Sequence, residues 1–585
     1  MRNAGGPETS VGPWTGDRFA ALALGVTLLP FVVAAVVLVV RVGSDYTAGS
    51  DIGLTELRTF DVGRHPVLLG PYSRDGWNHP GPALFYALAL PYRLAGSRSI
   101  GLALGALLIN GLAIAAMALV ARRVGRFPCM LVTLVGCAVL LRSLGPDFLR
   151  NPWNPYITVL PFGSLVFLTW AMTCGQVWAL PIGAGVASFC VQTHIGYAPI
   201  AVPLVVGGAI TLIVLTVRRH GDSVDARRRR YRAPIRAGVI AAAVLIVIWL
   251  PAVIQQIVDT PGNLSEVVQY FNNPKDPTHT FAEGYRAVSG QFELIPQWFT
   301  GHLEVIPFTG EPYLLYSAPL PVLLIPFGLA LLAFWRWRYS AANRLGALLL
   351  VTLVLGVFSI TRIIGPAYAY RLRWTWILGT LAFIVVLWAA WTLISRRTRG
   401  TDGGERVLAA VSLSALIVLS GVNAVSAARA GTPPDDNSAA LKKLGPAVEA
   451  ALPEGRGDVL VLSTPAGAGY QPAMVRYFER RGVAARVDRS VEDAYGSHRV
   501  HQPAAPLRTA LTIAAHEDFD ERVGAPNFRL VAYWGTRTQE ERRAILMRRA
   551  ELQAAYDAGR LSLHALAHKQ AALPLGSAVG VFMAR

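Results

Sequence analysis

Charged side chains are scarce in this chain of 585 residues: Asp, Glu, Lys and Arg make up 15% of it, whereas 53% is hydrophobic. A soluble protein of this size usually carries about 25% charge. The deficit is concentrated in apolar blocks of roughly 17–25 residues, the length that crosses a bilayer core of about 30 Å. Backbone polar groups find no partners in lipid, so such blocks must be helices. The scarcity of charge therefore excludes a soluble protein and predicts an all-α polytopic membrane domain.

Cysteine is rare as well. The four cysteines lie in or at the edge of apolar blocks, and none makes a CxxC pair: Cys129, Cys137, Cys174 and Cys190. This pattern excludes a disulfide framework and a cysteine zinc site, so the cysteines are most simply packing residues. A dinucleotide fingerprint is also missing, because the short glycine pair at 467–469 falls short of it. We expect no cofactor, and the question of a divalent metal stays open.

Acidic residues are outnumbered by basic ones, 36 to 54, which gives a formal net charge of +18. In a soluble protein such an excess would suggest a nucleic-acid partner. Here much of the excess clusters in short loops between apolar blocks, where it is typical of a topology signal. We therefore expect no nucleic acid.

Apolar blocks predict about eleven transmembrane helices. The first, about 19–41, is too long for a signal peptide and has no cleavage site, so it should remain in the protein. Before it, residues 1–18 should form a disordered cytoplasmic terminus. The other blocks lie near 99–121, 127–143, 155–172, 176–191, 197–217, 236–254, 317–335, 345–361, 374–395 and 406–427.

Four arginine-rich loops orient these helices. The loops follow predicted helices 2, 6, 8 and 10, at about 122–126, 218–236, 336–344 and 396–406. Such loops normally face the cytoplasm. If all four do, the helices alternate consistently, with the N-terminus inside and the C-terminus outside. The sequence thus predicts a multi-pass protein of the inner or plasma membrane, with a transmembrane domain over 19–427 and external loops at 42–98 and 255–316.

The remaining segment, 428–585, predicts a small α/β domain on the extracytoplasmic side. Short β-rich runs at 458–463, 483–488 and 527–535 read as strands. Between the first two, residues 468–482 have helical spacing and end at a glycine. Strand, helix and strand in this order are typical of α/β folds.

The first external loop carries the most informative residues. Asp51 and Glu56 follow the first helix, and the pair His79-Pro80 precedes an amphipathic segment at 82–96. That segment predicts a helix lying in the outer membrane interface. An acid at the membrane boundary is costly unless it is solvated or used. The simpler interpretation is a solvated loop acid, with His79-Pro80 as an ordinary helix start.

Residues 19–126 resemble the GT-C membrane glycosyltransferases, especially the protein O-mannosyltransferase and lipid A aminoarabinose transferase branch. In that branch an acid early in the first external loop precedes a His-Pro-Pro-Leu or Lys-Pro-Pro-Leu stretch, a juxtamembrane helix and a second helix that ends in basic residues. Two features differ here. The second proline is displaced, since the chain reads His79-Pro80-Gly81-Pro82, and Ile52 follows Asp51 where the family has an Asp-Glu pair.

The resemblance implies a function for these residues. Asp51 would take the proton from an acceptor hydroxyl as that hydroxyl attacks the sugar, a step that a positioned carboxylate can perform. His79 would lie near the phosphate of a polyprenyl-phosphate sugar donor. The leaving phosphate carries its own charge, so cationic groups can stabilise it without a metal. The acceptor would be a cell-envelope glycan, lipid or protein at the membrane lipid surface.

A second candidate site lies at 144–154. The resemblance makes Asp147 the further acid that many GT-C enzymes carry in their second external loop. Asn151, Trp153 and Asn154 stand beside it as candidate substrate contacts. The alternative is a plain turn, which a Pro/Asn-rich composition favours. Trp153 is then an interface anchor rather than a platform on which a sugar stacks.

Two further external stretches hold candidate substrate contacts. His194 lies in a polar break at 192–199 between apolar runs, which suggests a cavity lining, although a lone histidine there is more often a turn residue. Arg362, Arg371 and Arg373 lie outside, against the positive-inside bias. A guanidinium pairs with phosphate bidentately, so these arginines suggest a phosphate clamp. Arg371 and Arg373 share one face only if their segment is extended. The alternative is interfacial anchoring.

Two other functions remain open. A transporter or flippase would have charged or broken helices at mid-membrane and an internal repeat. The sequence shows no repeat, and its charges lie at helix ends. A non-catalytic binding protein of the GT-C fold would keep the architecture but tolerate the loss of Asp51.

Overall fold

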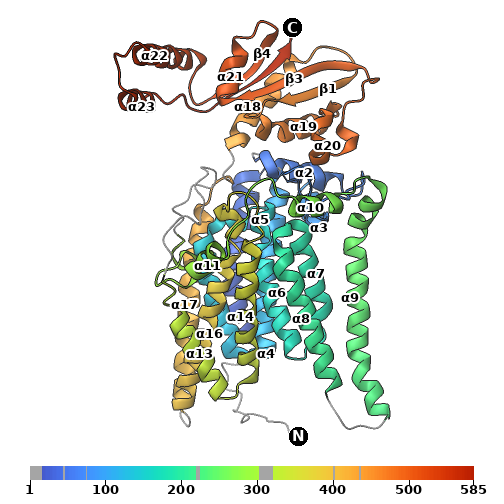
Figure 1. Cartoon of the computed structure of the whole chain (residues 1–585), viewed down its shortest axis with the longest axis vertical. Coiled ribbons are helices and arrows are strands. Elements are labelled where there is room, and N and C mark those ends of the chain that lie inside the picture. Colours follow the sequence, from blue (N-terminus) through green and yellow to red (C-terminus); the bar gives the residue numbers. More distant parts are fainter. Residues whose placement is uncertain are drawn as a thin grey trace. The chain divides into compact units, whose positions relative to one another are not determined.

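The computed structural model describes residues 16–43, 46–73, 75–218, 224–301, 320–398, 402–433 and 436–585. The chain divides into two compact units, each discontinuous in sequence. The first comprises Met1–Gly43 and Pro66–Pro433, and the second comprises Ser44–His65 and Pro434–Arg585. The first unit is a bundle of helices, and the second is a mixed sheet with helices packed against it (Figure 1).

Each of the eleven predicted spans is found as a helix, so the predicted polytopic membrane fold is confirmed. Among the described residues, eight helices are long and apolar enough to cross a membrane, and α7 and α13 are shorter. The start of the predicted span 317–335 lies outside the described residues, as does most of 1–18. The helices are α1 (Asp17–Val37), α4 (Ile100–Leu149), α6 (Val159–Thr173), α7 (Ala179–Thr193), α8 (Ala198–Val217), α9 (Val224–Val258), α13 (Leu324–Arg336), α14 (Ser340–Ile360), α16 (Thr375–Arg397) and α17 (Asp402–Arg429).

Helix α4 supplies two of the predicted spans because the chain kinks inside it. The backbone of Arg126 (φ 68°) is not helical, and this residue separates the spans predicted at 99–121 and 127–143. A second kink occurs at Gly145 (φ 75°), a conformation that glycine adopts easily. Pro146 then restarts the helix, as proline can in a first turn. Asp147 therefore lies in a helical turn rather than in the loop predicted from residue 144.

Three of the four predicted basic loops lie at one end of the bundle, together with the start of α1. Side-chain contacts link them to one another and to the α6–α7 turn. The contacts join Arg122 to Asp17, Arg123 to Gln176, Arg344 to the carbonyl of Thr173, and Arg396 to the ring of Trp337. Alternation of the helices is thus consistent with the predicted topology. Which side of the membrane this end faces stays a prediction.

Short helices lie at the opposite end of the bundle. The predicted interfacial helix is present as α3 (Ala83–Leu94), which buries Phe85, Leu88 and Tyr92 but leaves Leu90 and Leu94 exposed. The other short helices are α5 (Asn154–Ile157), α10 (Asn263–Asn272), α11 (Phe281–Ser289), α12 (Gln297–Thr300) and α15 (Ala369–Leu372).

The second unit contains a five-stranded sheet in the order β2-β1-β3-β5-β4. The first three strands are parallel, and β5 is antiparallel to both of its neighbours. The strands are β1 (Asp458–Ser463), β2 (Ala485–Arg486), β3 (Leu507–Ala515), β4 (Phe528–Gly535) and β5 (Ala578–Ala584). The predicted strands correspond to β1, β2 and β4, and the predicted helix to α19 (Gln471–Glu479). The sequence does not predict β3 and β5.

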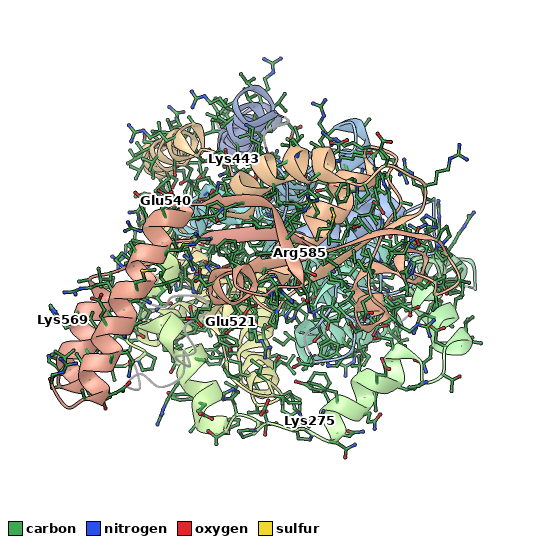
Figure 2. The ribbon with its side chains drawn as sticks, turned by 90° about the horizontal axis from the view of Figure 1, so that it is seen from above. Lys275, Lys443, Glu521, Glu540, Lys569 and Arg585 are labelled. Carbon is green, nitrogen blue, oxygen red and sulfur yellow. The ribbon has the colours of Figure 1, made fainter. Side chains whose placement is uncertain are left out.

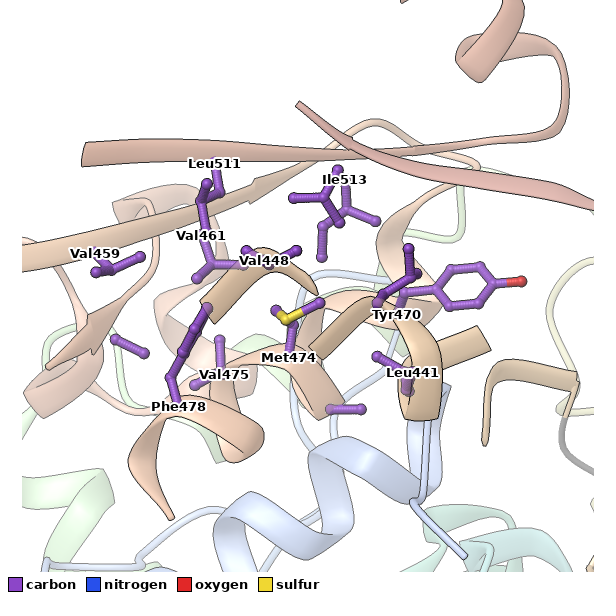
Figure 3. Packing of buried hydrophobic residues seen from close by; sticks show 14 of the residues in the cluster. Leu441, Val448, Val459, Val461, Tyr470, Met474, Val475, Phe478, Leu511 and Ile513 are labelled. Carbon is purple, nitrogen blue, oxygen red and sulfur yellow. The ribbon is translucent and has the colours of Figure 1, made fainter. Parts of the chain in front are cut away.

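The core of this unit lies between the sheet and two helices, α18 (Asp436–Ala451) and α19. Figure 3 shows Val461 and Ile513 of the strands pointing toward Val448 of α18 and Met474 of α19. The opposite face of the sheet is covered by α21 (His516–Val523), whose Phe519 packs on Phe582. Two more helices, α22 (Gln539–Asp557) and α23 (Leu563–Ala571), form a pair that extends from the sheet, as Glu540 and Lys569 mark in Figure 2.

An element that the sequence does not predict joins this core from far away in the chain. Helix α2 (Ser50–Asp61) follows α1, yet it belongs to the second unit. Its Leu57 is fully buried among residues of α18, α19 and the sheet. The first half of the predicted external loop 42–98 is therefore part of the α/β unit.

Candidate functional site

Two histidines from distant segments meet in the first unit. The rings of His79 and His194 lie 4.9 Å apart between centroids, and both residues are mostly buried. His79 is held in a short antiparallel turn, where its backbone N–H donates to Pro71 and its carbonyl accepts from Gly70. His194 ends α7 in an extended conformation. The structure thus brings together two residues that the sequence proposed separately.

Both rings are fixed as hydrogen-bond acceptors at one nitrogen. Nδ1 of His79 accepts from the backbone N–H of Ile195 (3.2 Å), and Nδ1 of His194 accepts from Gly196 (3.2 Å). In a neutral imidazole the other nitrogen then carries the proton. Each ring is left with an Nε2–H group that can donate to a ligand oxygen.

Burial keeps these histidines neutral. It lowers the pKa of His194 to about 3, with a further contribution from the charge of Arg371. Burial also holds the pKa of His79 well below its usual value of 6.5, and the charges of His194 and Arg371 lower it further. The pair is therefore a set of neutral hydrogen-bond donors beside one permanent cation.

That cation, Arg371, lies in the short helix α15. Its guanidinium donates to the carbonyl of Ile364 (3.3 Å) and lies 5.8 and 5.9 Å from the ring centroids of Tyr368 and Tyr370. Its charge also lowers the pKa of Tyr270, although burial and then Asp75 raise that pKa to about 12 overall. Arg371 thus joins His79, His194 and Tyr270 in one electrostatic cluster.

Arg373 is directed elsewhere. Residues 369–372 form a helical turn rather than the extended segment that a shared clamp requires, and two residues in a helix are roughly 200° apart around its axis. The guanidinium of Arg373 stacks 4.1 Å from the ring of Trp376 and hydrogen-bonds Tyr156. Arg362 is exposed over Phe358. Only Arg371 of the three predicted arginines lies at the histidine pair.

Aromatic side chains surround this end of the bundle. Trp153 contacts both Tyr156 and Tyr370, with ring centroids 5.0 and 4.8 Å away, and Tyr368 stacks on Tyr370. Trp77 packs edge-on against His79, with ring centroids 5.3 Å apart. Flat apolar faces of this kind can pack against sugar rings or a prenyl chain.

Buried polar atoms without a partner lie next to the histidines. Trp77 Nε1, Gln192 Oε1 and Thr193 Oγ1 have no hydrogen bond within the described part of the chain. Gln192 is held close to the backbone, since a Cβ on Gly81 would lie 2.5 Å from its Oε1. Leaving such a group unsatisfied costs about 1–3 kcal/mol. The cluster therefore has unused hydrogen-bonding capacity for a polar ligand.

The polar residues of the segment 147–154 are engaged in local structure. Asp147 forms an ion pair with Arg150 (2.5 Å), and Arg150 also donates to the carbonyl of Gly431 (2.7 Å). Asn151 accepts from the backbone N–H of Trp153, and Asn154 donates to the carbonyl of Thr193. Asn154 thereby connects this segment to the histidine pair, whereas Asp147 faces the end of α17.

The two acids of the first external loop lie in the second unit. Asp51 is exposed in the first turn of α2. Glu56 is buried, with ion pairs to Arg480 (2.5 Å) and Arg476 (3.7 Å). No group of three potential metal-ligating side chains occurs in the ranges that the structure describes.

Sequence reasoning missed Trp77, Tyr156 and Tyr270. Trp77 stands two residues before His79 and could have been found from that spacing. Tyr156 and Tyr270 lie in segments without a distinctive motif. Only the fold brings them to Arg373 and Arg371, respectively.

Taken together, the apolar helices of the first unit and the α/β fold of the second define a polytopic membrane protein with a small C-terminal sheet domain. No family model matches the chain, and no curated protein matches it. Solved structures do match, and those compared are GT-C superfamily glycosyltransferases, the superfamily that the sequence resembles.

One of these structures is ArnT from Cupriavidus metallidurans bound to undecaprenyl phosphate, with 13% identity, coverage of 90% of this chain and 97% of that chain, and a TM-score of 0.46. An Archaeoglobus fulgidus oligosaccharyltransferase matches with 12% identity over 84% of this chain and 67% of that chain, with a TM-score of 0.36. The arabinosyltransferase EmbB from Mycobacterium smegmatis matches with 13% identity over 73% and 42%, with a TM-score of 0.28. At these values the matches decide no residue role, donor or acceptor.

Proposed function

We propose that this protein is a membrane glycosyltransferase that moves a sugar from a polyprenyl-phosphate donor to a cell-envelope glycan, lipid or protein. The observation that carries the proposal is the cluster of Arg371, His79 and His194 at one end of the bundle. It combines one permanent cation with two neutral Nε2–H donors.

This cluster suits a phosphate monoanion or dianion at a membrane boundary. Arg371 can offer two parallel N–H groups to phosphate oxygens. The histidine donors need no proton from solvent, so their hydrogen bonds persist at neutral pH. Donors that are already oriented toward the place where charge develops stabilise a leaving phosphate without reorganisation. Trp77, Tyr368 and Tyr370 offer apolar faces beside it for the sugar and the prenyl chain.

Proton transfer from the acceptor is assigned to Asp51. The sequence resemblance supports this role, and the carboxylate is exposed in the first turn of α2. The other predicted acid, Asp147, is engaged by Arg150.

The membrane orientation forms part of the same proposal. The N-terminus is cytoplasmic in the inner or plasma membrane, and the transfer occurs on the extracytoplasmic face together with the α/β unit. Support comes from the basic turns that share one end of the bundle with the start of α1. The proposed cluster lies in segments predicted to be external, as a donor with an external sugar requires.

The test uses the full chain in proteoliposomes with polyprenyl-phosphate mannose and polyprenyl-phosphate arabinose as donors. A transferase releases polyprenyl phosphate when a cell-envelope fraction is supplied as acceptor, and the sugar appears on that acceptor. Movement of intact donor across the bilayer without cleavage would instead support a flippase. Binding without cleavage for every donor and acceptor fraction would support a non-catalytic binding protein.

A further inference from the structure

Helix α2 brings three acidic residues into the second unit, and two of them are buried there. Asp61, at its end, is fully buried. Both of its carboxylate oxygens accept from Arg499, each at 2.7 Å. This is the bidentate geometry that fixes the relative orientation of a guanidinium and a carboxylate.

Arg499 has no hydrogen-bonding capacity left for a ligand. Besides Asp61, it donates from Nε to Glu479 (2.6 Å) and from Nη1 to the carbonyl of Tyr495 (2.8 Å). Its side chain is 1% exposed. An arginine with every donor engaged inside the protein has a structural task rather than a binding one.

The middle and the start of α2 are also fastened to the second unit. Glu56 is paired with Arg480 and Arg476, and Leu57 enters the hydrophobic core. Before the helix, the backbone N–H of Thr47 donates to Ser438 Oγ (3.0 Å). The helix is therefore held at three levels along its length.

Buried ion pairs hold helix α2 in place, although apolar side chains at the same positions could also have stabilised it. Burying ion pairs carries a desolvation cost, and well-packed apolar residues often stabilise as much. Apolar packing is tolerant of small rotations, whereas a bidentate pair is not. The charges thus favour one orientation of α2 over neighbouring ones.

We infer that the α/β unit carries helix α2, and Asp51 with it, as one rigid part, and that Arg499 is a positioning residue for the transfer reaction. The inference rests on the proposed role of Asp51. Ten residues separate Asp51 from Asp61, about 15 Å along a helix. A small tilt at the Asp61 end therefore displaces Asp51 noticeably. A displacement of about 1 Å can cost about 100-fold in rate.

The experiment compares the full-length wild type with Arg499→Met, Arg499→Lys and Asp51→Asn. Hydrogen exchange reports the order of residues 50–61, and release of polyprenyl phosphate from the donors named above reports kcat and KM. In Arg499→Met we expect at least about 10-fold faster exchange over α2 and a kcat about 10–100-fold lower, with KM nearly unchanged. Arg499→Lys should partly restore both the slow exchange over α2 and the kcat, because a lysine keeps the positive charge but lacks the planar pair of N–H donors of a guanidinium.

The matched control is Arg548→Met, which removes an exposed arginine paired with Glu551 in α22 of the same unit. It should change neither readout. If Arg499→Met does not fold, Arg480→Gln is used instead. It removes one of the two arginines that form ion pairs with Glu56, at a side chain that is 30% exposed, and it should give a smaller change of the same kind.

Unchanged exchange over residues 50–61 in Arg499→Met, or in Arg480→Gln if that variant replaces it, overturns the inference. A lower kcat without faster exchange overturns it too, because the arginine then acts by another route. Faster exchange with normal kcat in both Arg499→Met and Asp51→Asn has a different meaning. In that case α2 is carried by the α/β unit, but the proposed catalytic role of Asp51 fails.

Discussion

The part of the chain that the structure describes contains a cluster of arginine and histidine in each unit, and the two clusters differ in the partners of their arginines. In the first unit, Arg371 contacts a carbonyl and two tyrosine rings, and it has no ion pair within the described residues. In the second unit, Arg499 is bound to two carboxylates. Arg371 can therefore still attract an anionic ligand, whereas the charge of Arg499 is already neutralised inside the protein.

This difference shows why residue type alone does not identify a site. A partly buried cation without a carboxylate partner, such as Arg371, retains its electrostatic attraction for a ligand. A cation that is saturated by carboxylates has already used it. The comparison predicts that substitutions in the two clusters have separable effects, on stability in the second unit and on ligand binding in the first.

The largest effect is expected for Asp61→Asn. This change leaves Arg499 buried with half of its carboxylate partners, and breaking a buried pair from one side costs about 3–5 kcal/mol. Denaturant unfolding of the second unit, followed by hydrogen exchange, measures the loss. Glu551→Gln, at the exposed pair with Arg548, is the control and should cost about 0–1 kcal/mol.

The double variant Asp61→Leu/Arg499→Met sharpens this prediction. Replacing both partners by apolar residues should recover most of the stability, since neither member of the closest pair is left as a buried charge without the other. Glu479 keeps a second cation, Arg476, at 3.7 Å. If the double variant is as unstable as Asp61→Asn, the Asp61–Arg499 pair contributes to the free energy of unfolding by more than the mutual neutralisation of its two charges.

The next largest effect is expected for Asp51→Asn. Loss of a general base should lower the turnover by about 100-fold or more. Because Asp51 is exposed, the substitution should leave the stability and the affinity for undecaprenyl phosphate unchanged. Release of polyprenyl phosphate measures the turnover. Normal turnover in this variant, with a loss in Asp147→Asn, would transfer the role to Asp147.

A smaller effect is expected for Arg371→Ala in the first cluster. Losing a charge-assisted hydrogen bond costs about 1.5–3 kcal/mol, or roughly one to two decades in the affinity for undecaprenyl phosphate. Arg371→Lys should recover only part of this, because an ammonium lacks the planar fork. Binding is measured on the purified full chain. Arg362→Ala, on an exposed arginine of the same loop region, is the control, and equal losses in both alanine variants would exclude a specific clamp.

Much of the fold could be predicted from the sequence because its signals are local. Each transmembrane helix is specified by its own apolar residues, and β1, α19 and β2 by alternating and helical spacing. The strand β5 escaped prediction because Gly580 and small neighbours give it a weak pattern. The sequence could not assign helix α2 to the α/β unit, because the partners of residues such as Leu57 and Asp61 lie more than 370 residues away in the chain.

The candidate site was predictable in part for the same reason. His79, His194 and Arg371 stand out in polar breaks between apolar runs, so each could be proposed alone. Their meeting depends on helix packing, which one sequence does not specify. The expectation that Arg371 and Arg373 share a face required an extended segment, and the helical turn at 369–372 separates them.

The smallest effect concerns pH and the histidine of the second cluster. His65 stacks on His498 at 3.8 Å, near Asp61, Arg58 and Arg499 and the α19 residues Glu479 and Arg476. Desolvation, followed by the charge of His498, lowers the pKa of His65 below its usual value of 6.5, although the residue is exposed. The folded state therefore binds this proton less readily than the unfolded state does, and stability should fall as the pH drops through 6.5.

Asp61 adds a second step at lower pH. Although burial raises its pKa, the 3.3 Å contact with His498 and the hydrogen bonds from Arg499 outweigh burial, so the pKa lies below the usual value of 3.8. Its contribution is complete above pH 3.8 and is lost as the pH falls through the folded value. Replacing His65 by Phe should thus remove only the loss that begins near pH 6.5 and retain the one below pH 3.8, as unfolding of the second unit at each pH can show. An unchanged profile just below pH 6.5 would mean that His65 does not couple to the network, which would then respond to acid through its carboxylates alone.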